Sequence, residues 1–169
     1  MGGNGAAALA ELKDLTADLG GELNRMAWEL RPMALDDLGL RTAITQYLEE
    51  WGERAGLRID LEIALDERRL PQAVETALFR VLQEAITNVV KHSGADQVGV
   101  ILEATDGEVR LIIEDNGHGF VLDNGTELAL GMKHFGLLGV RERLALVKGS
   151  LEVESAPNSG TTVYVRVPI

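Results

Sequence analysis

The stretch "LIIEDNGHGF", residues 111–120, ends an apolar run with an acid and then places two glycines around a histidine. With the three residues before it, it predicts a strand, "EVRLIIED", that ends at Asp115. A carboxylate at a strand end can point into the crevice between a sheet and a helix, where it needs hydrogen-bond donors. The alternative is an ordinary polar turn, because Asp-Asn-Gly is a strong turn signal. We expect His118, between the glycines, to be an exposed loop residue.

Two predicted hairpins are built around this stretch. The strand "QVGVILEA", residues 97–104, joins "EVRLIIED" through the turn "TDG". A second hairpin, "SLEVES" and "TTVYVRVPI", closes the chain across the polar turn "APNSG". One more strand is predicted at residues 57–63, "LRIDLEI", where apolar and polar residues alternate.

The helices are predicted from apolar residues at helical spacing. A long helix spans about Gln72–Lys91 and stops at "HSGAD". A glycine-spaced loop at residues 116–139 leads to the helix "VRERLALVK", with Gly149 as its C-terminal cap. This order of helices and strands predicts an α+β sandwich, in which the helices cover one face of the sheet.

The N-terminal part is also predicted to be helical. Apolar residues between positions 9 and 30 recur every three or four positions, which is typical of a surface helix over the core or of a dimerising helix. Pro32 forces a break. A second helical pattern at residues 40–51 ends near Gly52 or Gly56. We expect residues 1–55 to be a helical segment and residues 56–169 to be a separate domain.

Composition limits the partners. The 169 residues carry 27 acidic and 16 basic side chains, a net charge of -11, so the overall field repels nucleic acid and anionic membrane. The chain has no cysteine, which excludes disulfide scaffolds and thiolate zinc sites and suits a reducing, cytoplasmic compartment. No apolar run approaches the ~18 residues of a membrane span, so any span of a larger sensor lies outside this chain. We expect no nucleic-acid partner and no direct membrane contact.

Polar residues form a stripe on the long predicted helix. Glu84, Asn88 and Lys91 can share one face, and His92 follows at the helix end. A solvated helix face is one interpretation. The other is a magnesium site, because Mg²⁺ takes one or two protein oxygens and completes its shell with water and phosphate.

Three further features fit a nucleotide. An adenine amino group is a donor for Asp115. Gly117 and Gly119 lack a Cβ, which lets the backbone approach a flat ring or adopt a positive φ. "HFGLLGVRERL" places glycines before a helix N-terminus, which suits phosphate oxygens, although a flexible loop before a plain helix start has the same pattern. Thr161, at a strand start, could reach Asp115 or an ordered water through its hydroxyl group.

In order and spacing, "LQEAITNVVKHSGA", "DNGHGF", "GLLGVRERL" and "SGTTVYVRVP" resemble the ATP-binding boxes of the superfamily of DNA gyrase, heat-shock chaperones, histidine kinases and mismatch-repair ATPases. The resemblance spans residues 70–169. Upstream, "ELRPMALDDLGLRTAITQYLEEW" resembles the second dimerisation helix and linker of histidine kinases that pair with nitrate-sensor-type response regulators. The resemblance implies a Bergerat-type ATP-binding fold, a two-layer sandwich of helices and a mixed, mostly antiparallel sheet.

On the phosphate side, the resemblance implies that Asn88 ligates a Mg²⁺ ion bridging the ATP phosphates, and that Glu84 assists the metal or its water. Lys91 and His92 would line the phosphate or ribose side of the pocket. Charge stabilisation by Mg²⁺ and Lys91, together with positioning, would then supply most of the catalysis.

On the base side, Asp115 would accept the adenine amino group, Gly117 and Gly119 would shape the base pocket, and Thr161 would support Asp115. Gly136, Leu137 and Gly139 belong to the lid that the resemblance places over the phosphates. Lys133 and His134 fall in the same lid, but no motif assigns them a phosphate contact.

One part of the kinase pattern is missing. The three histidines, His92, His118 and His134, all lie in the nucleotide region, so the chain has no phospho-accepting histidine followed by an acid. The resemblance therefore implies the catalytic fragment of a two-component histidine kinase, with its acceptor on a dimerisation helix outside the chain and a response regulator downstream. Residues 1–55 would be the remnant of the dimerisation helix and linker, compatible with a homodimer.

Two alternatives stay open at this point. One is a nucleotide-sensing or dimerisation module that transfers no phosphate. The other is a serine kinase of the anti-sigma-factor type, which uses the same pocket on a protein substrate.

Overall fold

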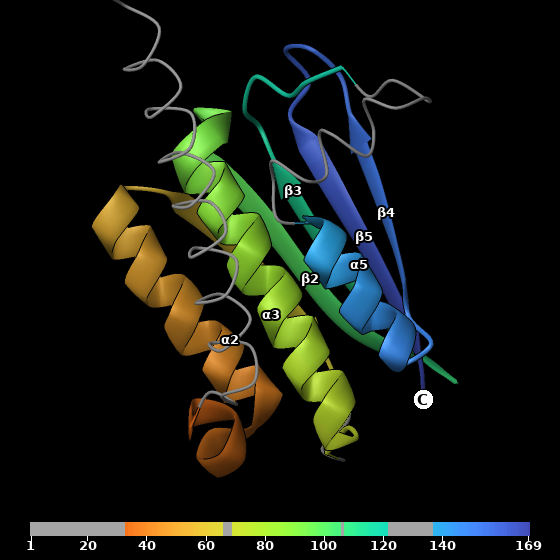
Figure 1. Ribbon diagram of the computed structural model, residues 1–169. Coiled ribbons are helices and arrows are strands. Elements are labelled where there is room, and N and C mark those ends of the chain that lie inside the picture. The colour runs from red at the N-terminus through yellow and green to blue at the C-terminus, as the bar shows by residue number, and fades with distance from the viewer. Residues whose placement is uncertain (1–32, 66–68, 106, 122–136) are drawn as a thin grey trace, which may run out of the picture. The chain divides into compact units, whose positions relative to one another are not determined.

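The computed structural model describes residues 33–65, 69–105, 107–121 and 137–169 (Figure 1). Residues from Ala34 to Ile169 form one compact unit, which is described below. The apolar seam at residues 9–30 lies outside the described residues. No helix in the described ranges is long and apolar enough to cross a membrane.

A five-stranded mixed sheet forms one layer. Its strands are β1 (Arg58–Ala64), β2 (Gln97–Thr105), β3 (Glu108–Asp115), β4 (Ser150–Ser155) and β5 (Thr161–Pro168), in the spatial order β1-β2-β3-β5-β4. Only the β1–β2 pair is parallel, because a helix connects these two strands, whereas tight turns connect the antiparallel hairpins. The mixed, mostly antiparallel sheet predicted from the sequence is confirmed.

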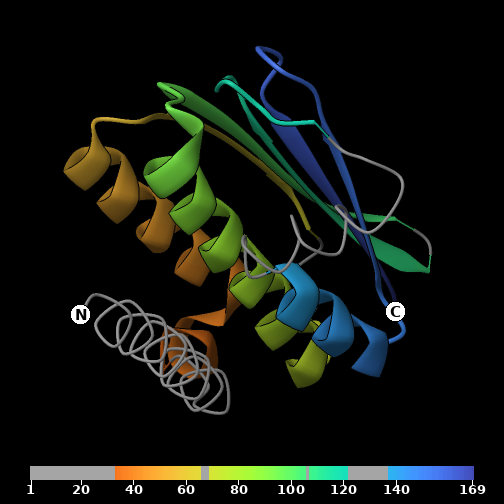
Figure 2. The same cartoon turned by 45° about the horizontal axis from the view of Figure 1, so that its top comes forward.

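Helices form the second layer. In Figures 1 and 2, α2 (Met33–Ala55), α3 (Gln72–Asn88) and α5 (Leu137–Leu146) lie on the same face of the sheet. Alternate residues of the central strands point into this layer and are buried, because side chains along a strand point to opposite faces. They include Val98, Val100, Leu102, Val109, Leu111, Ile113, Val163, Val165 and Val167. The predicted α+β sandwich is therefore confirmed.

The helix α2 is bent, and its buried Leu40, Ile44 and Leu48 contribute to this core. Gly39 has φ 78° and ψ 170°, so two helical pieces meet at a kink. Arg69 donates to the carbonyl of Leu35 at 2.8 Å and to both carboxylate oxygens of Glu75 at 2.9 and 3.0 Å. Glu75 is only 2% exposed. Arg69 thus ties the kink to the first turn of α3.

Three helix boundaries differ from prediction. The long helix continues past Asn88 as a π-helical turn, η1 (Val89–Ser93), instead of ending at Lys91. Gly149 as the cap of α5 was wrong: Lys148 has the positive φ, 56°, and the N–H groups of Lys148 and Gly149 donate to Ala145 and Leu144. That is a Schellman motif, in which the left-handed residue comes one position before Gly149. The helix α5 also begins at Leu137, three residues earlier than predicted.

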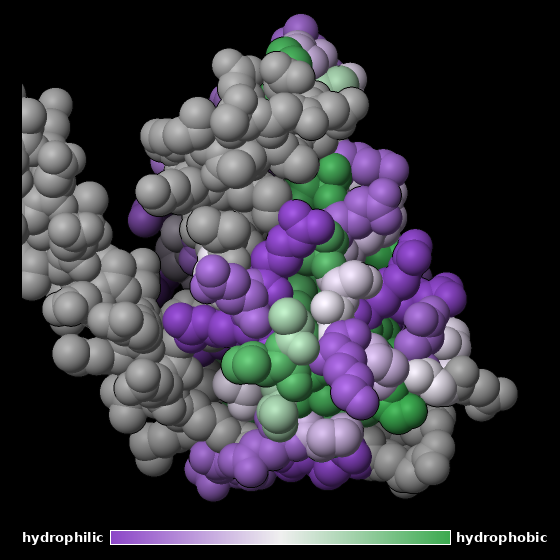
Figure 3. All heavy atoms as spheres, turned by 45° about the vertical axis from the view of Figure 1, so that its right-hand side comes forward, coloured by the Kyte–Doolittle hydropathy of each residue, from purple (hydrophilic) through white to green (hydrophobic). Residues whose placement is uncertain are grey.

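One face of the surface carries both polar and apolar residues. On the face shown in Figure 3, hydrophilic residues surround a smaller group of hydrophobic ones. The strongly exposed apolar side chains of the described part include Leu146 on α5 and Val121 after β3.

Candidate functional site

A pocket lies between two parts of the fold. One side is the C-terminal part of α3 together with η1, and the other is the C-terminal end of β3 and the N-terminal end of β5. Its walls are mostly apolar and its polar groups converge from three segments distant in sequence. The lining residues are Ala85, Asn88, Val89, His92, Ser93, Ile113, Asp115, His118, Gly119, Phe120, Thr161 and Val163. A concave, largely apolar site with a few converging polar groups is the usual form of a small-molecule site.

Asp115 is the acid of this pocket. It follows the buried Ile113 by two positions, so its side chain points to the same inner face, and it is 6% exposed. Its carboxylate accepts the N–H of Gly117 at 2.8 Å and also the backbone N–H of Thr161. Burial raises the pKa of Asp115, while these donors and the nearby His118 oppose the increase. The site therefore holds a desolvated carboxylate with acceptor capacity left for a ligand donor.

The glycines allow the chain to approach itself closely here. A Cβ on Gly117 would lie 2.4 Å from the carbonyl oxygen of Ser93. Gly119 has φ 56°, and a Cβ there would lie 2.2 Å from the carbonyl oxygen of Ala156. The positive φ that the sequence offered as one reason for these glycines is observed at Gly119, and the close contacts at both positions are with the protein itself.

A row of polar side chains crosses three neighbouring strands, from the pocket floor to the strand beside it. In the sheet register, Asp115 on β3 pairs with Thr161 on β5, and Thr161 pairs with Ser155 on β4. The hydroxyl oxygen of Thr161 lies 3.1 Å from Ser155 Oγ, while its backbone N–H serves Asp115. Sequence reasoning missed Ser155, although the alternation of buried Leu151 and half-buried Val153 places it on the same inner face.

The polar residues that the sequence placed together along α3 do not all face the pocket. Asn88 and His92 line the pocket, but Glu84 and Lys91, both described residues, do not. Glu84 is half-buried on the side of α2, and burial raises its pKa against the effect of Lys91. Burial also raises the pKa of Tyr47 on α2, and the charge of Glu84 adds to that increase. The π turn after Asn88 is the kind of helix irregularity that occurs at functional sites.

Ser93 is a second residue that sequence reasoning missed. It is buried, and its hydroxyl donates to the carbonyl of Val89 at 2.9 Å and accepts the N–H of Ala95 at 3.0 Å. Its carbonyl accepts the N–H of His118 at 2.9 Å. Ser93 therefore joins the end of η1 to the glycine loop. His118 is exposed, as expected, but it also lines the pocket.

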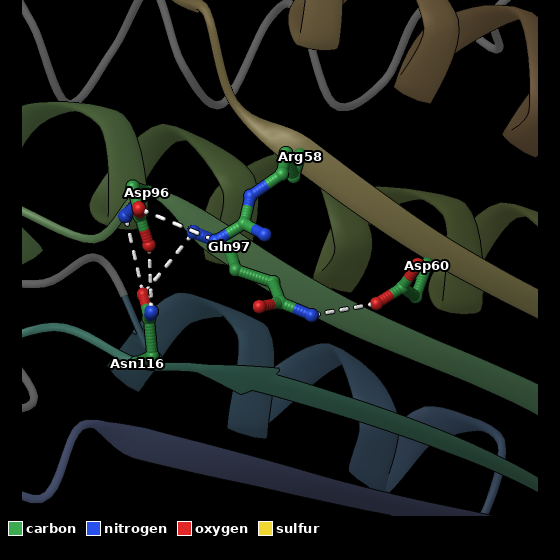
Figure 4. A network of polar contacts seen from close by, with 5 residues as sticks. All are labelled: Arg58, Asp60, Asp96, Gln97 and Asn116. Atoms are coloured by element: carbon green, nitrogen blue, oxygen red, sulfur yellow. Dashed lines mark hydrogen bonds and ion pairs between the residues drawn. The ribbon is translucent and has the colours of Figure 1, made fainter.

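Asn116 fixes the outside of the same loop (Figure 4). Its Oδ1 accepts the N–H groups of Asp96 and Gln97, each at 3.1 Å, and its Nδ2 donates to Asp96 Oδ1 at 2.7 Å. The hydrogen bond from Asn116, followed by the charge of Arg58, lowers the pKa of Asp96. Gln97 extends the network to Asp60 on β1 at 2.7 Å. The Asn116 side chain thus pins the end of β3 to the start of β2.

The predicted lid residues are only partly described. Leu137 begins α5 and Gly139 lies in its first turn. Gly136, Lys133 and His134 lie outside the described residues.

Comparisons with known proteins agree with this fold and pocket. Residues 73–169 match the family model described as histidine kinase-, DNA gyrase B-, and HSP90-like ATPase. The chain therefore belongs to this ATPase family, and it contains the ATP-binding domain that the family's members share. Within the family, curated proteins similar to it are histidine kinases, so the chain carries the ATP-binding domain of a histidine kinase, as the resemblance implied.

The histidine-protein kinase/phosphatase DegS of Brevibacillus brevis is 39% identical over 165 residues, which cover 96% of this chain and 42% of that protein. The sensor histidine kinase LiaS of Bacillus subtilis is 35% identical over 148 residues, 88% of this chain and 39% of that protein. The histidine kinase domain of the Erythrobacter litoralis EL346 blue-light activated kinase shares the fold, with a TM-score of 0.59 and 21% identity over 76% of this chain and 60% of that one. The chain thus spans about two fifths of the length of these two curated relatives.

Proposed function

We propose that the pocket binds MgATP with adenine at Asp115 and supports transfer of the γ-phosphoryl group to a histidine on a dimerisation helix outside this chain. The observation that carries the proposal is the buried carboxylate at the pocket floor, held by two backbone N–H groups and facing apolar walls. An adenine amino group is a donor that such a carboxylate can accept.

The described residues fit a magnesium ion. No group of three or more His, Cys, Asp or Glu side chains in the described part is arranged to hold a metal, and Mg²⁺ bound with phosphate needs only one or two protein ligands. Asn88 lines the pocket on the α3 side, and Glu84 lies one turn earlier. We assign Asn88 as a ligand and Glu84 as a group that acts on the metal or its water. When bound, the ion would neutralise phosphate charge.

The remaining residues have positioning or electrostatic roles in this proposal. His92 lies at the pocket edge on the phosphate or ribose side, and Lys91, exposed beside it, supplies positive charge. Gly136, Leu137 and Gly139 belong to the lid, and Gly117, Gly119 and Thr161 complete the base pocket. The attacking imidazole nitrogen and its general base belong to the partner helix.

The wider assembly is also part of the proposal. Residues 1–55 are the remnant of a dimerisation helix and linker, and residues 56–169 are the catalytic domain. Since the compact unit begins at Ala34, α2 is the part of that linker that packs onto the catalytic domain. We propose a homodimer through the N-terminal helix, a response regulator as the later phosphate acceptor and a cytoplasmic location, which the absence of cysteine suits.

Calorimetric titration of MgATP into the parent and into Asp115→Asn tests base recognition. Asn replaces one carboxylate oxygen with an NH2 group, so a donor faces either the adenine amino group or the backbone N–H groups that the carboxylate serves. We expect a loss of affinity of about 100-fold, the size of one strong charge-assisted hydrogen bond. Glu114→Gln, the same change at the exposed neighbour on the opposite face of β3, is the control. If Asp115→Asn binds MgATP as tightly as Glu114→Gln does, the proposal that Asp115 recognises adenine is wrong.

Transfer is tested separately with labelled ATP and a dimerisation-helix pair of a longer parent protein. Acid-labile label on that helix pair is the expected result. ATP binding without any transfer would instead favour a nucleotide-sensing module, which the lack of an acceptor histidine outside the nucleotide region of this chain motivates.

A further inference from the structure

The side chain of Ser155 is saturated by three hydrogen bonds at the end of β4. Its Oγ donates to the carbonyl of Gly160 at 2.9 Å and accepts the N–H of Phe120 at 2.9 Å. The third partner is the hydroxyl oxygen of Thr161 at 3.1 Å. A serine hydroxyl has one proton and two acceptor sites, so these three contacts account for all of its capacity.

This saturation determines the direction of the Ser155–Thr161 hydrogen bond. A carbonyl oxygen can only accept, so the single proton of Ser155 is committed to Gly160. Thr161 must then be the donor in its contact with Ser155. The Thr161 hydroxyl consequently has no proton left for the pocket that it lines, and it presents only lone pairs there.

The pocket floor is therefore made of acceptors. The carboxylate of Asp115 lies next to Thr161 in the sheet register and also accepts hydrogen bonds. A purine with an amino group at C6 offers two N–H donors to such a floor. A purine with an oxo group at C6 places an acceptor against acceptors at that position, and a site built to pair with a donor at one position disfavours an analogue with an acceptor there.

We propose that Ser155 is a specificity-determining positioning residue, which selects 6-amino over 6-oxo purine nucleotides by fixing the proton of Thr161. This inference rests on the proposed nucleotide function and adds a determinant beyond Asp115. Ser155 itself does not line the pocket, so it acts through Thr161 and not by contact with the base.

The test is the ratio of the affinities for MgATP and MgITP, measured by calorimetry. Inosine differs from adenosine in carrying an oxo group at C6 and a proton on N1, so sugar and phosphate contacts cancel in the ratio. In Ser155→Ala the Thr161 proton is released and can turn toward a 6-oxo group. We expect the ATP:ITP ratio to fall about five- to tenfold, the size of one neutral hydrogen bond.

A merely structural role would give a different result. If Ser155→Ala acted only by removing the hydrogen bond to the Phe120 N–H, the affinities for MgATP and MgITP would fall equally, and the ATP:ITP ratio would not change. Thr161→Val should lower the ratio by itself, and adding Ser155→Ala to it should change the ratio less than twofold, because the two residues act through one hydroxyl. Ser150→Ala, exposed at the other end of β4, is the control and should retain the parental ratio.

Ser155→Cys covers the case in which Ser155→Ala does not fold. Cysteine is close in size but is a weak donor and a weak acceptor, so the ratio should again fall. A parental ratio in the folded Ser155 variant, or a parent that binds ATP and ITP equally, overturns the inference while nucleotide binding stands. A parent that binds neither nucleotide refutes the proposed function itself, and the inference with it.

Discussion

Gly117→Ala should be strongly destabilising, because the new methyl group has no room. It would lie 2.4 Å from the Ser93 carbonyl oxygen, 2.7 Å from Ser93 Cβ and 2.8 Å from Asp115 Oδ1. Favourable contacts between nonbonded carbon atoms lie at about 3.5–4.0 Å. The Ser93 carbonyl cannot retreat freely, since it accepts the N–H of His118 at 2.9 Å.

The size of the effect follows from two terms. Overpacking a tight site costs about 1–3 kcal/mol, and losing the Ser93–His118 hydrogen bond costs about 1 kcal/mol. We therefore expect the free energy of unfolding to fall by roughly 2–4 kcal/mol, and the thermal midpoint by about 5–15 °C for a domain of this size. Because Asp115 Oδ1 must also move, MgATP affinity should fall in the folded fraction.

Gly99→Ala is the matched control. Gly99 lies on the outward face of β2, and no atom lies within 4 Å of the position of its Cβ. The same substitution should be neutral there or stabilising by up to about 1 kcal/mol, because alanine loses less backbone entropy on folding. Urea denaturation followed by circular dichroism compares the two variants. If their free energies of unfolding differ by less than about 1 kcal/mol, the steric argument is wrong.

Three further predictions concern single positions. Lys148→Gly should raise the thermal midpoint by about 2–4 °C, because glycine adopts the positive φ of 56° without a Cβ clash, and a lower midpoint would contradict the Schellman assignment. Gly139→Ala should stabilise α5 by roughly 0.5–1 kcal/mol in urea denaturation, since its Cβ position is open, and destabilisation would indicate that the residue needs a non-helical conformation. Burial raises the pKa of Asp115, so its proton binds at a higher pH than the ordinary ~4. Adenine recognition needs the ionised form, so the ATP:ITP affinity ratio should fall as the pH is lowered from 7.5 through the raised pKa of Asp115, and a constant ratio down to pH 4 would refute this.

Local patterns determined most of the elements. The alternation that ends at Asp115 places that carboxylate on the inner face whatever the rest of the fold does, because side-chain direction in a strand repeats every two residues. The helical spacing of α3 likewise predicted its buried face, but of the polar residues expected on one face only Asn88 lines the pocket, where His92 from η1 joins it. Helix ends were less predictable, because a π turn or a left-handed lysine depends on hydrogen bonds that no short sequence pattern specifies.

Only the tertiary structure decided which groups meet at the pocket floor. Ser155, Thr161 and Asp115 come from three strands, and they form a row because β5 lies between β3 and β4 in the sheet. The sequence by itself identified Asp115 and its glycines, since an acid at a strand end and a missing Cβ are local properties. That Gly117 must leave room for Ser93, and that Ser155 directs the Thr161 proton, depend on distances between segments brought together by folding.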